Sequence, residues 1–278
     1  GIDCFEVSGG TQYERCNKII PCHGDRVFTN LEEARAIKEV ASVPVITVGK
    51  ILDAQLMSEV VERGEVDGVV IGRALLADEE FVRKAMDERY EQIAPCTGCG
   101  IGCVGEQTKR HPATCVINPR AGRERELVWT KTEEPKHVLV SGGGIGGLTA
   151  AYVCARRGHR VTLAEKSEEL GGQMRLACRA PYKQEISKWM IYLKQQCADH
   201  PIDIRLQCEA DAALVSELHP DAVIVATGAK PQLPPFAKEG SITAHDVLEE
   251  KVSIPGGNVA IIGGGMVGIE TAEYLMAN

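Results

Sequence analysis

The first 95 residues alternate short apolar runs, rich in β-branched side chains, with amphipathic stretches. The runs with the length and composition of buried strands are CFEV, VPVITVGKI and VDGVVIGRALL. The stretches with helical spacing are NLEEARAIKEVAS, DAQLMSEVVERGE and ADEEFVRKAMDE, and the predicted N-caps of the first two are Asn30 and Asp53. Near-continuous apolar strands separated by single helices predict an α/β fold with a parallel sheet covered on its faces.

The periodicity disappears between residues 96 and 130 and then returns. HVLVSGGGIGGLTAAYVCARRGHRVTLAEK reads as strand, glycine turn, helix and strand, and a helix at EISKWMIYLKQQCAD and a strand at DAVIVATGAKP follow. NVAIIGGGMVGIETAEYLMAN repeats the order of strand, glycine turn and helix about 121 residues after the first copy, so the chain contains an internal repeat. The charged stretch TKTEEP predicts a domain boundary before the first copy.

Composition narrows the class of protein. The chain has 278 residues, is 44% hydrophobic and carries a net charge of −8, which suits a globular protein of about two domains. It has no apolar run of about 18 residues, no signal peptide and no block of basic residues, which argues against membrane or nucleic acid as partner and predicts a cytoplasmic protein. Because the chain starts inside a strand pattern and stops inside a helical one, we expect it to be a fragment of a longer polypeptide.

The first glycine turn has the pattern of a dinucleotide site. Gly142, Gly144 and Gly147 form G-x-G-x-x-G directly after an apolar strand, and Glu165 ends the next strand. The first glycine allows the tight turn, the second the approach of a pyrophosphate and the third close packing of helix on strand, while the acid can bind a ribose hydroxyl. The second copy has Gly263, Gly265 and Gly268, with a vestigial turn as the alternative.

Four cysteines lie within twenty residues, in the spacing C-x2-C-x3-C-x11-C, at Cys96, Cys99, Cys103 and Cys115. Thiolates in such a group bind tetrahedral zinc or an iron–sulfur cluster. The uneven spacing and the intervening glycines favour a cluster, and zinc or unliganded thiols are the alternatives. In a reducing compartment such thiols more often bind metal than form disulfides.

Two predicted strands end in a glycine followed by a cation, Gly49–Lys50 and Gly72–Arg73. In (β/α)8 barrels the loops after the last two strands commonly bind a phosphate group with backbone amides and a basic side chain. A solvated cation at a strand end is the alternative.

Together these motifs resemble the iron–sulfur flavoenzymes that contain 2,4-dienoyl-CoA reductase, 2-enoate reductase and trimethylamine dehydrogenase. GVVIGRALLADEEF is similar to the family's last barrel strand with its FMN phosphate loop, CTGCGIGC…TCVINPRAGRE to its [4Fe–4S] segment, and GGGIGGLTAAYVCARRGHRVTLAEKSEELGGQ to its FAD fingerprint. The resemblance implies part of an FMN-binding TIM barrel, the cluster segment, a Rossmann-like FAD-binding domain and the start of an NAD(P)-binding domain. The corresponding predicted ranges are 1–95, 96–130, 136–230 and 231–278.

The resemblance also assigns residues to cofactors. It implies FMN phosphate at Gly49, Lys50, Gly72 and Arg73, and cluster ligation by Cys96, Cys99, Cys103 and Cys115. It implies FAD at Gly142, Gly144, Gly147, Glu165, Gly172, Gln173, Thr227 and Gly228, and NAD(P)H at Gly263, Gly265 and Gly268. The family's catalytic His has no counterpart in SGGTQYERCNKIIPCHG, where Tyr13 is the predicted proton donor.

The activity that the resemblance implies is NAD(P)H-dependent reduction of an activated C=C bond in a small molecule such as a 2-enoate, a dienoyl-CoA or a related enone. Electrons would pass from NAD(P)H to FAD, to the [4Fe–4S] cluster, to FMN and to the substrate. An amine dehydrogenase, an electron-transfer module similar to the small subunit of glutamate synthase and an inactive product of a truncated gene are the alternatives. The expected partners are the substrate and, in a homo-oligomer, further copies of the chain. This stretch alone is expected to be inactive and poorly stable.

Overall fold

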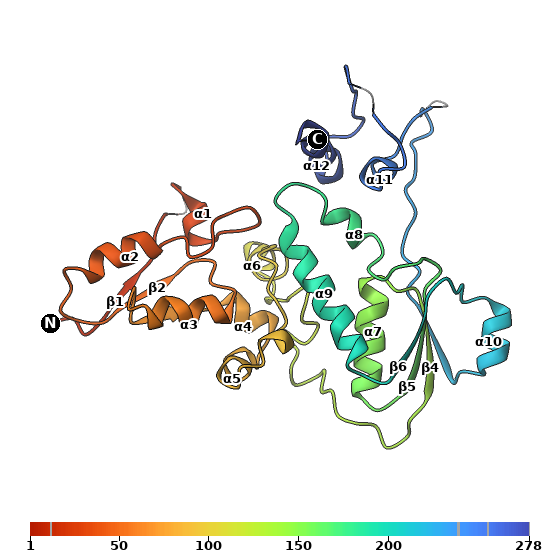
Figure 1. The fold of residues 1–278 in the computed structure, drawn as a ribbon, viewed down its shortest axis with the longest axis horizontal. Coiled ribbons are helices and arrows are strands. Elements are labelled where there is room, and N and C mark those ends of the chain that lie inside the picture. The colour runs from red at the N-terminus through yellow and green to blue at the C-terminus, as the bar shows by residue number, and fades with distance from the viewer. Residues whose placement is uncertain (12, 238–239, 255, 278) are drawn as a thin grey trace. The chain divides into compact units, whose positions relative to one another are not determined.

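The computed structural model describes residues 1–11, 13–237, 240–254 and 256–277. They form two compact units, which span Gly1–Val128 and Trp129–Asn278. Among the described residues, no helix has the length and apolar character needed to cross a membrane. Figure 1 shows the elements of each unit.

The first unit is built on a three-stranded parallel sheet in the order β1-β2-β3. Its strands are β1 (Phe5–Val7), β2 (Val45–Val48) and β3 (Gly68–Val70), and its first helices are α1 (Cys16–Ile19), α2 (Leu31–Lys38) and α3 (Ala54–Glu62). In the register of the last two strands, Val48 pairs with Val70. Buried residues of the strands and helices, among them Val45, Met57 and Phe81, form one hydrophobic core. The predicted parallel sheet is therefore present, and its last two strands end side by side.

Two residues were predicted to cap helices of the first unit, Asp53 and Asn30. The prediction for Asp53 is confirmed, and that for Asn30 is wrong in part. The Asp53 side chain accepts hydrogen bonds from the backbone N–H groups of Gln55 and Leu56 and caps α3 as predicted. Asn30 precedes α2 but makes no capping hydrogen bond. Its side-chain Nδ2 instead donates to the carbonyl of Val48 at 2.8 Å, so this buried amide ties α2 to the end of β2.

The run VDGVVIGRALL is only partly a strand, which corrects its prediction. β3 ends at Val70, and the residues after Gly72 form the short helix α4 (Arg73–Ala77). The carbonyl of Gly72 accepts the backbone N–H groups of Leu75 and Leu76, which starts the helix. Three short helices follow, α5 (Phe81–Met86), the 3-10 helix η1 (Tyr90–Gln92) and α6 (Val104–Thr108). Arg73 therefore stands at the first position of a helix, directly after the carboxyl end of β3.

The second unit contains a four-stranded parallel sheet in the order β6-β5-β4-β7. Its strands are β4 (His137–Ser141), β5 (Arg160–Ala164), β6 (Ile202–Arg205) and β7 (Ala222–Val225), and its helices up to β7 are α7 (Ile145–Arg156), α8 (Met174–Ala177), α9 (Gln184–Ala198) and α10 (Ala212–Leu218). In Figure 1, α7 and α9 cover one face of the sheet and α10 covers the other. Sequence order 3-2-1-4 is that of a Rossmann-type half, as the first glycine turn predicts.

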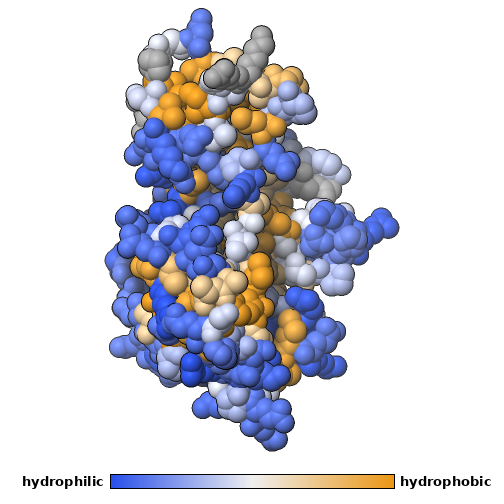
Figure 2. Space-filling view, turned by 90° about the vertical axis from the view of Figure 1, so that its right-hand side faces the viewer, coloured by the Kyte–Doolittle hydropathy of each residue, from blue (hydrophilic) through white to orange (hydrophobic). Residues whose placement is uncertain are grey.

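The second copy of the repeat folds only in part. The helices α11 (Ala244–Leu248) and α12 (Met266–Ala277) form, but the predicted strand at NVAII does not. A strand needs a neighbour to receive its backbone hydrogen bonds, and none of the described residues pairs with this run. Figure 2 shows hydrophobic residues gathered over the C-terminal part of the chain, at the top of the view. Exposed apolar side chains there include Val259, Ile262, Met266, Val267 and Met276.

The centre of the second sheet predicts a test of its core. Leu139 on β4 is fully buried and packs with Ala164 and Leu214, so Leu139→Ala leaves a cavity that should lower the free energy of unfolding by about 2–5 kcal/mol. Val223→Ala on the neighbouring β7 is the matched control, because Val223 is 44% exposed and its loss should cost less than about 1 kcal/mol. Urea unfolding followed by circular dichroism measures both values. Equal losses would contradict the assignment of Leu139 to the core.

Candidate cofactor sites

The first dinucleotide turn needs glycine at its two ends for reasons that the geometry makes explicit. Gly142 has a φ of +106°, and a Cβ added there would lie 2.4 Å from the carbonyl oxygen of Ala226. A Cβ added at Gly147 would lie 1.8 Å from the carbonyl oxygen of Gly142. Both contacts are impossible for any other residue, so the turn and the packing of α7 against it depend on these glycines.

The middle glycine faces a different environment. Gly144 is the N-cap of the twelve-residue helix α7, and the nearest atom to a Cβ added there is the Cα of Gly172, at 4.0 Å. The backbone on this side is therefore open to an approaching group. The N-terminus of a helix favours negative charge, so a pyrophosphate is the chemistry that this turn suits.

Two segments that are distant in sequence, residues 171–173 and 227–229, converge on this turn. The backbone N–H of Gly171 donates to the carbonyl of Gly143 at 2.8 Å, which brings the run Gly172–Gln173 against it. Thr227 lies against Gly142, because its Cα is 3.2 Å from the position of an added Cβ. Gln173 Nε2 donates to the carbonyl of Ala229, beside Gly228. The structure thus brings together all the residues that the resemblance assigns to FAD.

Glu165 is held in place by backbone amides. The carboxylate is 7% exposed and accepts from the N–H of Gly143 at 2.5 Å and from the N–H of Ser167 at 2.8 Å. Burial is the largest single influence and would raise the pKa of Glu165, but the hydrogen bonds from Ser167 and Gly143 outweigh it and hold the pKa below its usual value. The acid is therefore ionised and fixed beside the turn, where an acceptor for ribose hydroxyls is expected.

The second glycine turn has the same local geometry as the first. Gly263 has a φ of +114°, and a Cβ added at Gly268 would lie 2.0 Å from the Gly263 carbonyl oxygen. Gly265 immediately precedes α12 and has no atom within 4 Å of an added Cβ. The turn and its helix therefore form without the strand that precedes them in the first copy.

Both predicted phosphate-binding cations lie at one edge of the first sheet. Gly49–Lys50 follows β2 and Gly72–Arg73 follows β3, and the parallel pairing of these strands places the two pairs side by side. Lys50, 4% exposed, donates to the carbonyl of Asp25 at 2.7 Å, and Arg73 Nη2 donates to the carbonyl of Pro21 at 2.6 Å.

Arg73 has capacity left for an anion. Its Nη1 is buried and has no hydrogen-bond partner among the described residues. A buried guanidinium nitrogen without an acceptor is costly, and a phosphate oxygen would satisfy it. The residues present therefore fit an FMN phosphate, although no motif in the sequence points to the Pro21–Asp25 segment that holds both cations.

The four cysteines of the irregular segment lie in one neighbourhood. Cys96 interacts electrostatically with Cys99 and Cys115, and Cys115 with Cys99 and Cys103. The approach of Cys115 depends on Thr114, whose N–H donates to the carbonyl of Gly102 at 2.9 Å. A Cβ on Gly102 would lie 2.6 Å from the Thr114 carbonyl oxygen, so this glycine is needed for the pairing of the two loops rather than for approach to a cluster.

The surroundings of these thiols suit an iron–sulfur cluster. The N–H of Gly98 donates to the sulfur of Cys96 at 3.5 Å, and the N–H groups of Asn118 and Ile117 lie close enough to Cys115 to lower the pKa of its thiol. Such hydrogen bonds stabilise charge on cluster sulfurs. Within the described ranges, no three thiol, imidazole or carboxylate groups converge on a point that a single ion could occupy. The preference for a cluster over zinc therefore rests on the spacing of the cysteines in the sequence.

Burial favours the protonated form of the Cys96 and Cys115 thiols when no metal is bound. It raises the pKa of Cys96 to about 11, against a smaller opposing effect of the Gly98 N–H and of Arg73. Burial likewise raises the pKa of Cys115, while the Asn118 and Ile117 amides oppose it. A metal must therefore displace protons to bind here, as is general for thiolate ligands.

The predicted proton donor is Tyr13. Among the described residues, its hydroxyl makes no hydrogen bond to the phosphate-binding cations or to the four cysteines. Tyr13 is 87% exposed, and its backbone N–H donates to Thr11 Oγ1 at 3.3 Å. The ring is not packed against the rim of the sheet. Its role stays a prediction.

Two families of known proteins match the chain. Residues 136–277 match the pyridine nucleotide-disulphide oxidoreductase family, and residues 16–92 match the NADH:flavin oxidoreductase / NADH oxidase family.

Individual relatives match along most of the chain. It is 39% identical to an NADH oxidase of Thermoanaerobacter brockii over 99% of its own length and 43% of the relative, and 37% identical to a cinnamate reductase of Clostridium sporogenes over 86% and 36%. A solved 2-naphthoyl-CoA reductase in complex with 2-naphthoyl-CoA is 28% identical, with a TM-score of 0.92 over 99% of the chain and 42% of that structure. The chain thus spans less than half the length of these relatives.

The first turn predicts a sharp difference between two neighbouring glycines. Gly147→Ala should abolish flavin binding to the second unit, because its Cβ would overlap the Gly142 carbonyl oxygen. Gly146→Ala is the matched control, since no atom lies within 4 Å of an added Cβ there and it should keep the flavin. Flavin absorbance per protein after gel filtration measures both. Full flavin content in the Gly147→Ala variant would contradict the packing described.

Glu165 predicts a pH dependence. Its pKa is lowered in the folded state, so its contribution to stability is complete above the ordinary value of 4.5 and is lost as the pH falls through the lower folded value. Glu165→Gln should therefore lower the free energy of unfolding at pH 7, and the difference from the parent protein should shrink below about pH 4.5. Urea unfolding at pH 7, 5 and 4 gives the comparison. A difference that stays constant over this range would argue against an ionised, amide-bound carboxylate.

Proposed function

Because the chain belongs to the pyridine nucleotide-disulphide oxidoreductase family over residues 136–277, and its residues 16–92 match the NADH:flavin oxidoreductase / NADH oxidase family, we propose that it acts as part of an NAD(P)H-dependent reductase of activated C=C bonds. These matches bear out the family resemblance that the motifs carry. The substrate class is a small unsaturated acid, thioester or enone, as cinnamate and naphthoyl-CoA are for the relatives that those names describe.

One observation carries the proposal, the proximity of the phosphate-binding cations to the cysteine segment. Arg73 lies within electrostatic reach of Cys96. The side chain of Lys50 lies beside Gly98, with its Cε 3.6 Å from the position of an added Cβ. A flavin phosphate and an iron–sulfur cluster bound by these residues would be immediate neighbours. Such proximity is what exchange of electrons between the two cofactors requires.

Each group of residues has a part in this arrangement. The open backbone at Gly144 and the carboxylate of Glu165 hold a dinucleotide, Lys50 and Arg73 bind a phosphate, and the four cysteines bind iron as thiolates. When bound, the flavins supply hydride transfer and the cluster supplies single-electron transfer. Tyr13 is the proton donor proposed from this part of the polypeptide, and its exposure leaves it accessible to an incoming molecule.

The alternatives differ in what they require of the chain. A module similar to the small subunit of glutamate synthase has no FMN barrel, so the match of residues 16–92 to a flavin oxidoreductase family argues against it. An amine dehydrogenase has no need of a nicotinamide site, whereas the second glycine turn here keeps the geometry of the first. Stopped-flow reduction of the flavin by NADH or NADPH separates this rival from the proposed reductase.

The proposal predicts the composition and activity of the whole protein that contains this chain. Purified without oxygen, it should contain FMN and FAD in equal amounts, with roughly four iron and four sulfide per chain. It should oxidise NADH or NADPH when given cinnamate or a conjugated enone. Absence of FMN, or of iron and sulfide, would refute the electron path.

A cysteine variant predicts where the path is interrupted. Cys115→Ser should lose iron and at least about tenfold of the enone reduction while FAD reduction by NADH or NADPH persists. Cys16→Ser is the matched control, because this exposed cysteine of α1 should change neither quantity. Iron analysis and the two rates are the measurements. Full enone reduction in an iron-free Cys115→Ser protein would contradict the proposal.

A further inference from the structure

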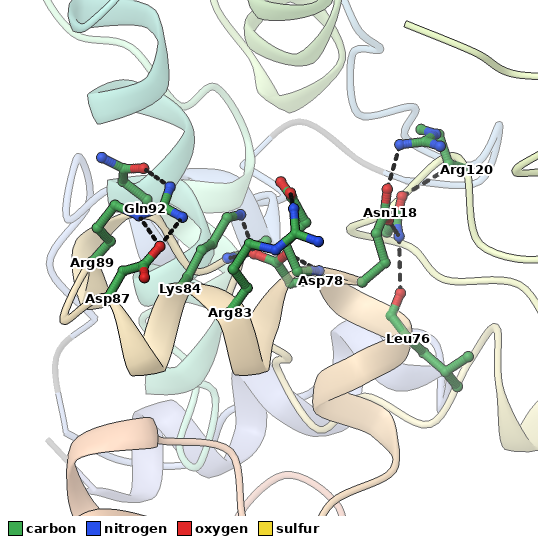
Figure 3. A network of polar contacts seen from close by, with 12 residues as sticks. Leu76, Asp78, Arg83, Lys84, Asp87, Arg89, Gln92, Asn118 and Arg120 are labelled. Carbon is green, nitrogen blue, oxygen red and sulfur yellow. Dashed lines mark hydrogen bonds and ion pairs between the residues drawn. The ribbon is translucent and has the colours of Figure 1, made fainter.

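A network of polar contacts joins the helices after β3 to the chain that follows Cys115. Figure 3 shows it from close by, with Asn118 and Arg120 reaching toward the α4–α5 region. On the helix side Asp78 is almost completely buried, pairs with Lys84 at 2.6 Å and accepts the N–H of Ala94 at 2.8 Å. The network therefore holds both the beginning and the end of the cysteine segment against the same helical region.

Asn118 is the residue of this network whose side chain links the two segments most completely. It is 8% exposed, and its Nδ2 donates to the carbonyl of Leu76 and to Glu79 Oε2, both at 3.1 Å. Its Oδ1 accepts the backbone N–H of Arg120 at 3.0 Å. The Arg120 guanidinium pairs with the other oxygen of Glu79.

The backbone of the same residue faces the fourth cysteine. Asn118 stands three residues after Cys115, and its backbone N–H, like that of Ile117, is close enough to the sulfur of Cys115 to lower the pKa of that thiol. The side chain of Asn118 is thus bound to the end of α4, while its amide is directed at a predicted cluster ligand. A displacement of the Asn118 side chain also moves the Asn118 backbone amide, because both belong to one residue.

Asn118 is hydrogen-bonded to α4, the helix that begins with Arg73. Within the five residues of α4, the first is the predicted phosphate-binding cation near Cys96, and the carbonyl of Leu76, in the last turn, receives the Asn118 amide. The last turn of the helix is therefore hydrogen-bonded to the chain after Cys115, and its first residue lies within electrostatic reach of Cys96. Asn118 and Arg120 bond to Leu76 and Glu79, so more than one bond holds the chain after Cys115 to the end of α4.

We propose that Asn118 is a positioning residue that fixes the Cys115 sulfur relative to α4, and so fixes the cluster relative to the flavin phosphate bound at Arg73. This inference rests on the proposed function. A backbone amide near a ligand sulfur also stabilises the additional negative charge of a reduced cluster, so moving the Asn118 amide away would lower the reduction potential.

Asn118→Asp tests the link with little change of volume. The carboxylate keeps an acceptor for the Arg120 N–H but loses the donor to Leu76 and adds a negative charge beside Glu79. We expect a lower midpoint potential and an altered EPR spectrum of the reduced cluster, with iron retention under chelator reduced about tenfold or more. In Asn118→Asp/Glu79→Gln, the new amide can donate to the new carboxylate, and the potential should return toward the parent value.

The control is Arg89→Ala, a partly exposed residue of the region in Figure 3 whose side chain bonds to Asp87 and Gln92. It should leave potential, spectrum and iron content unchanged. Asn118→Ser, which is too short to reach Leu76, provides a second variant if Asn118→Asp does not fold. All measurements use the whole protein, with FAD content confirming that the second unit is intact.

The outcomes separate this inference from the function on which it rests. A parent protein without iron would refute the proposed function itself. A parent cluster whose potential and EPR spectrum are the same in Asn118→Asp and Asn118→Ser would overturn the positioning role alone. A variant that is only less stable, with unchanged potential in the folded fraction, would equally overturn it.

Discussion

The constraint on which both units depend is the parallel pairing of their strands. Parallel strands bring their carboxyl ends to one edge, and residues that follow different strands meet there without being near in sequence. In the first unit this edge carries Lys50 after β2 and Arg73 after β3. In the second it carries Gly142 after β4, Glu165 after β5 and Ala226 after β7. The candidate sites are therefore consequences of strand register, with loops supplying the remaining contacts.

Backbone groups do much of the positioning at these edges. Glu165 is oriented by two N–H groups, Arg73 by a carbonyl and Asn118 by a carbonyl and a neighbouring N–H. Almost every residue type carries a backbone N–H and every one a C=O, so a hydrogen bond to the backbone does not require a particular residue and leaves no motif in the sequence. This explains why a charged or amide side chain can be placed accurately by residues that no pattern singles out.

The extent of prediction from sequence follows from the same distinction. Local signals were sufficient for the cap at Asp53, for the glycine turns and for the parallel sheets, because each depends on a few adjacent residues or on periodicity. Asn30 stands at the predicted N-cap of α2, but its side chain bonds to a carbonyl 18 residues away and does not cap the helix. The run after Gly72 was predicted as a strand and forms a helix instead. The pairing of Gly102 with Thr114 and the role of Asn118 had no signal at all, because irregular segments lack a period from which contacts can be inferred.

The irregular backbone of the cysteine segment leaves amide groups free to act on the cysteine sulfurs. Its thiols are partly buried, and burial favours the protonated form of Cys96 and Cys115, which opposes metal binding. The amides of Gly98, Ile117 and Asn118 and the charge of Arg73 act in the other direction, since each favours the thiolate. A helix or strand would have used those amides in its own hydrogen bonds. Loss of regular structure in this segment of the first unit is therefore what frees backbone donors for sulfur, and the network around Asn118 supplies the rigidity that regular structure would otherwise provide.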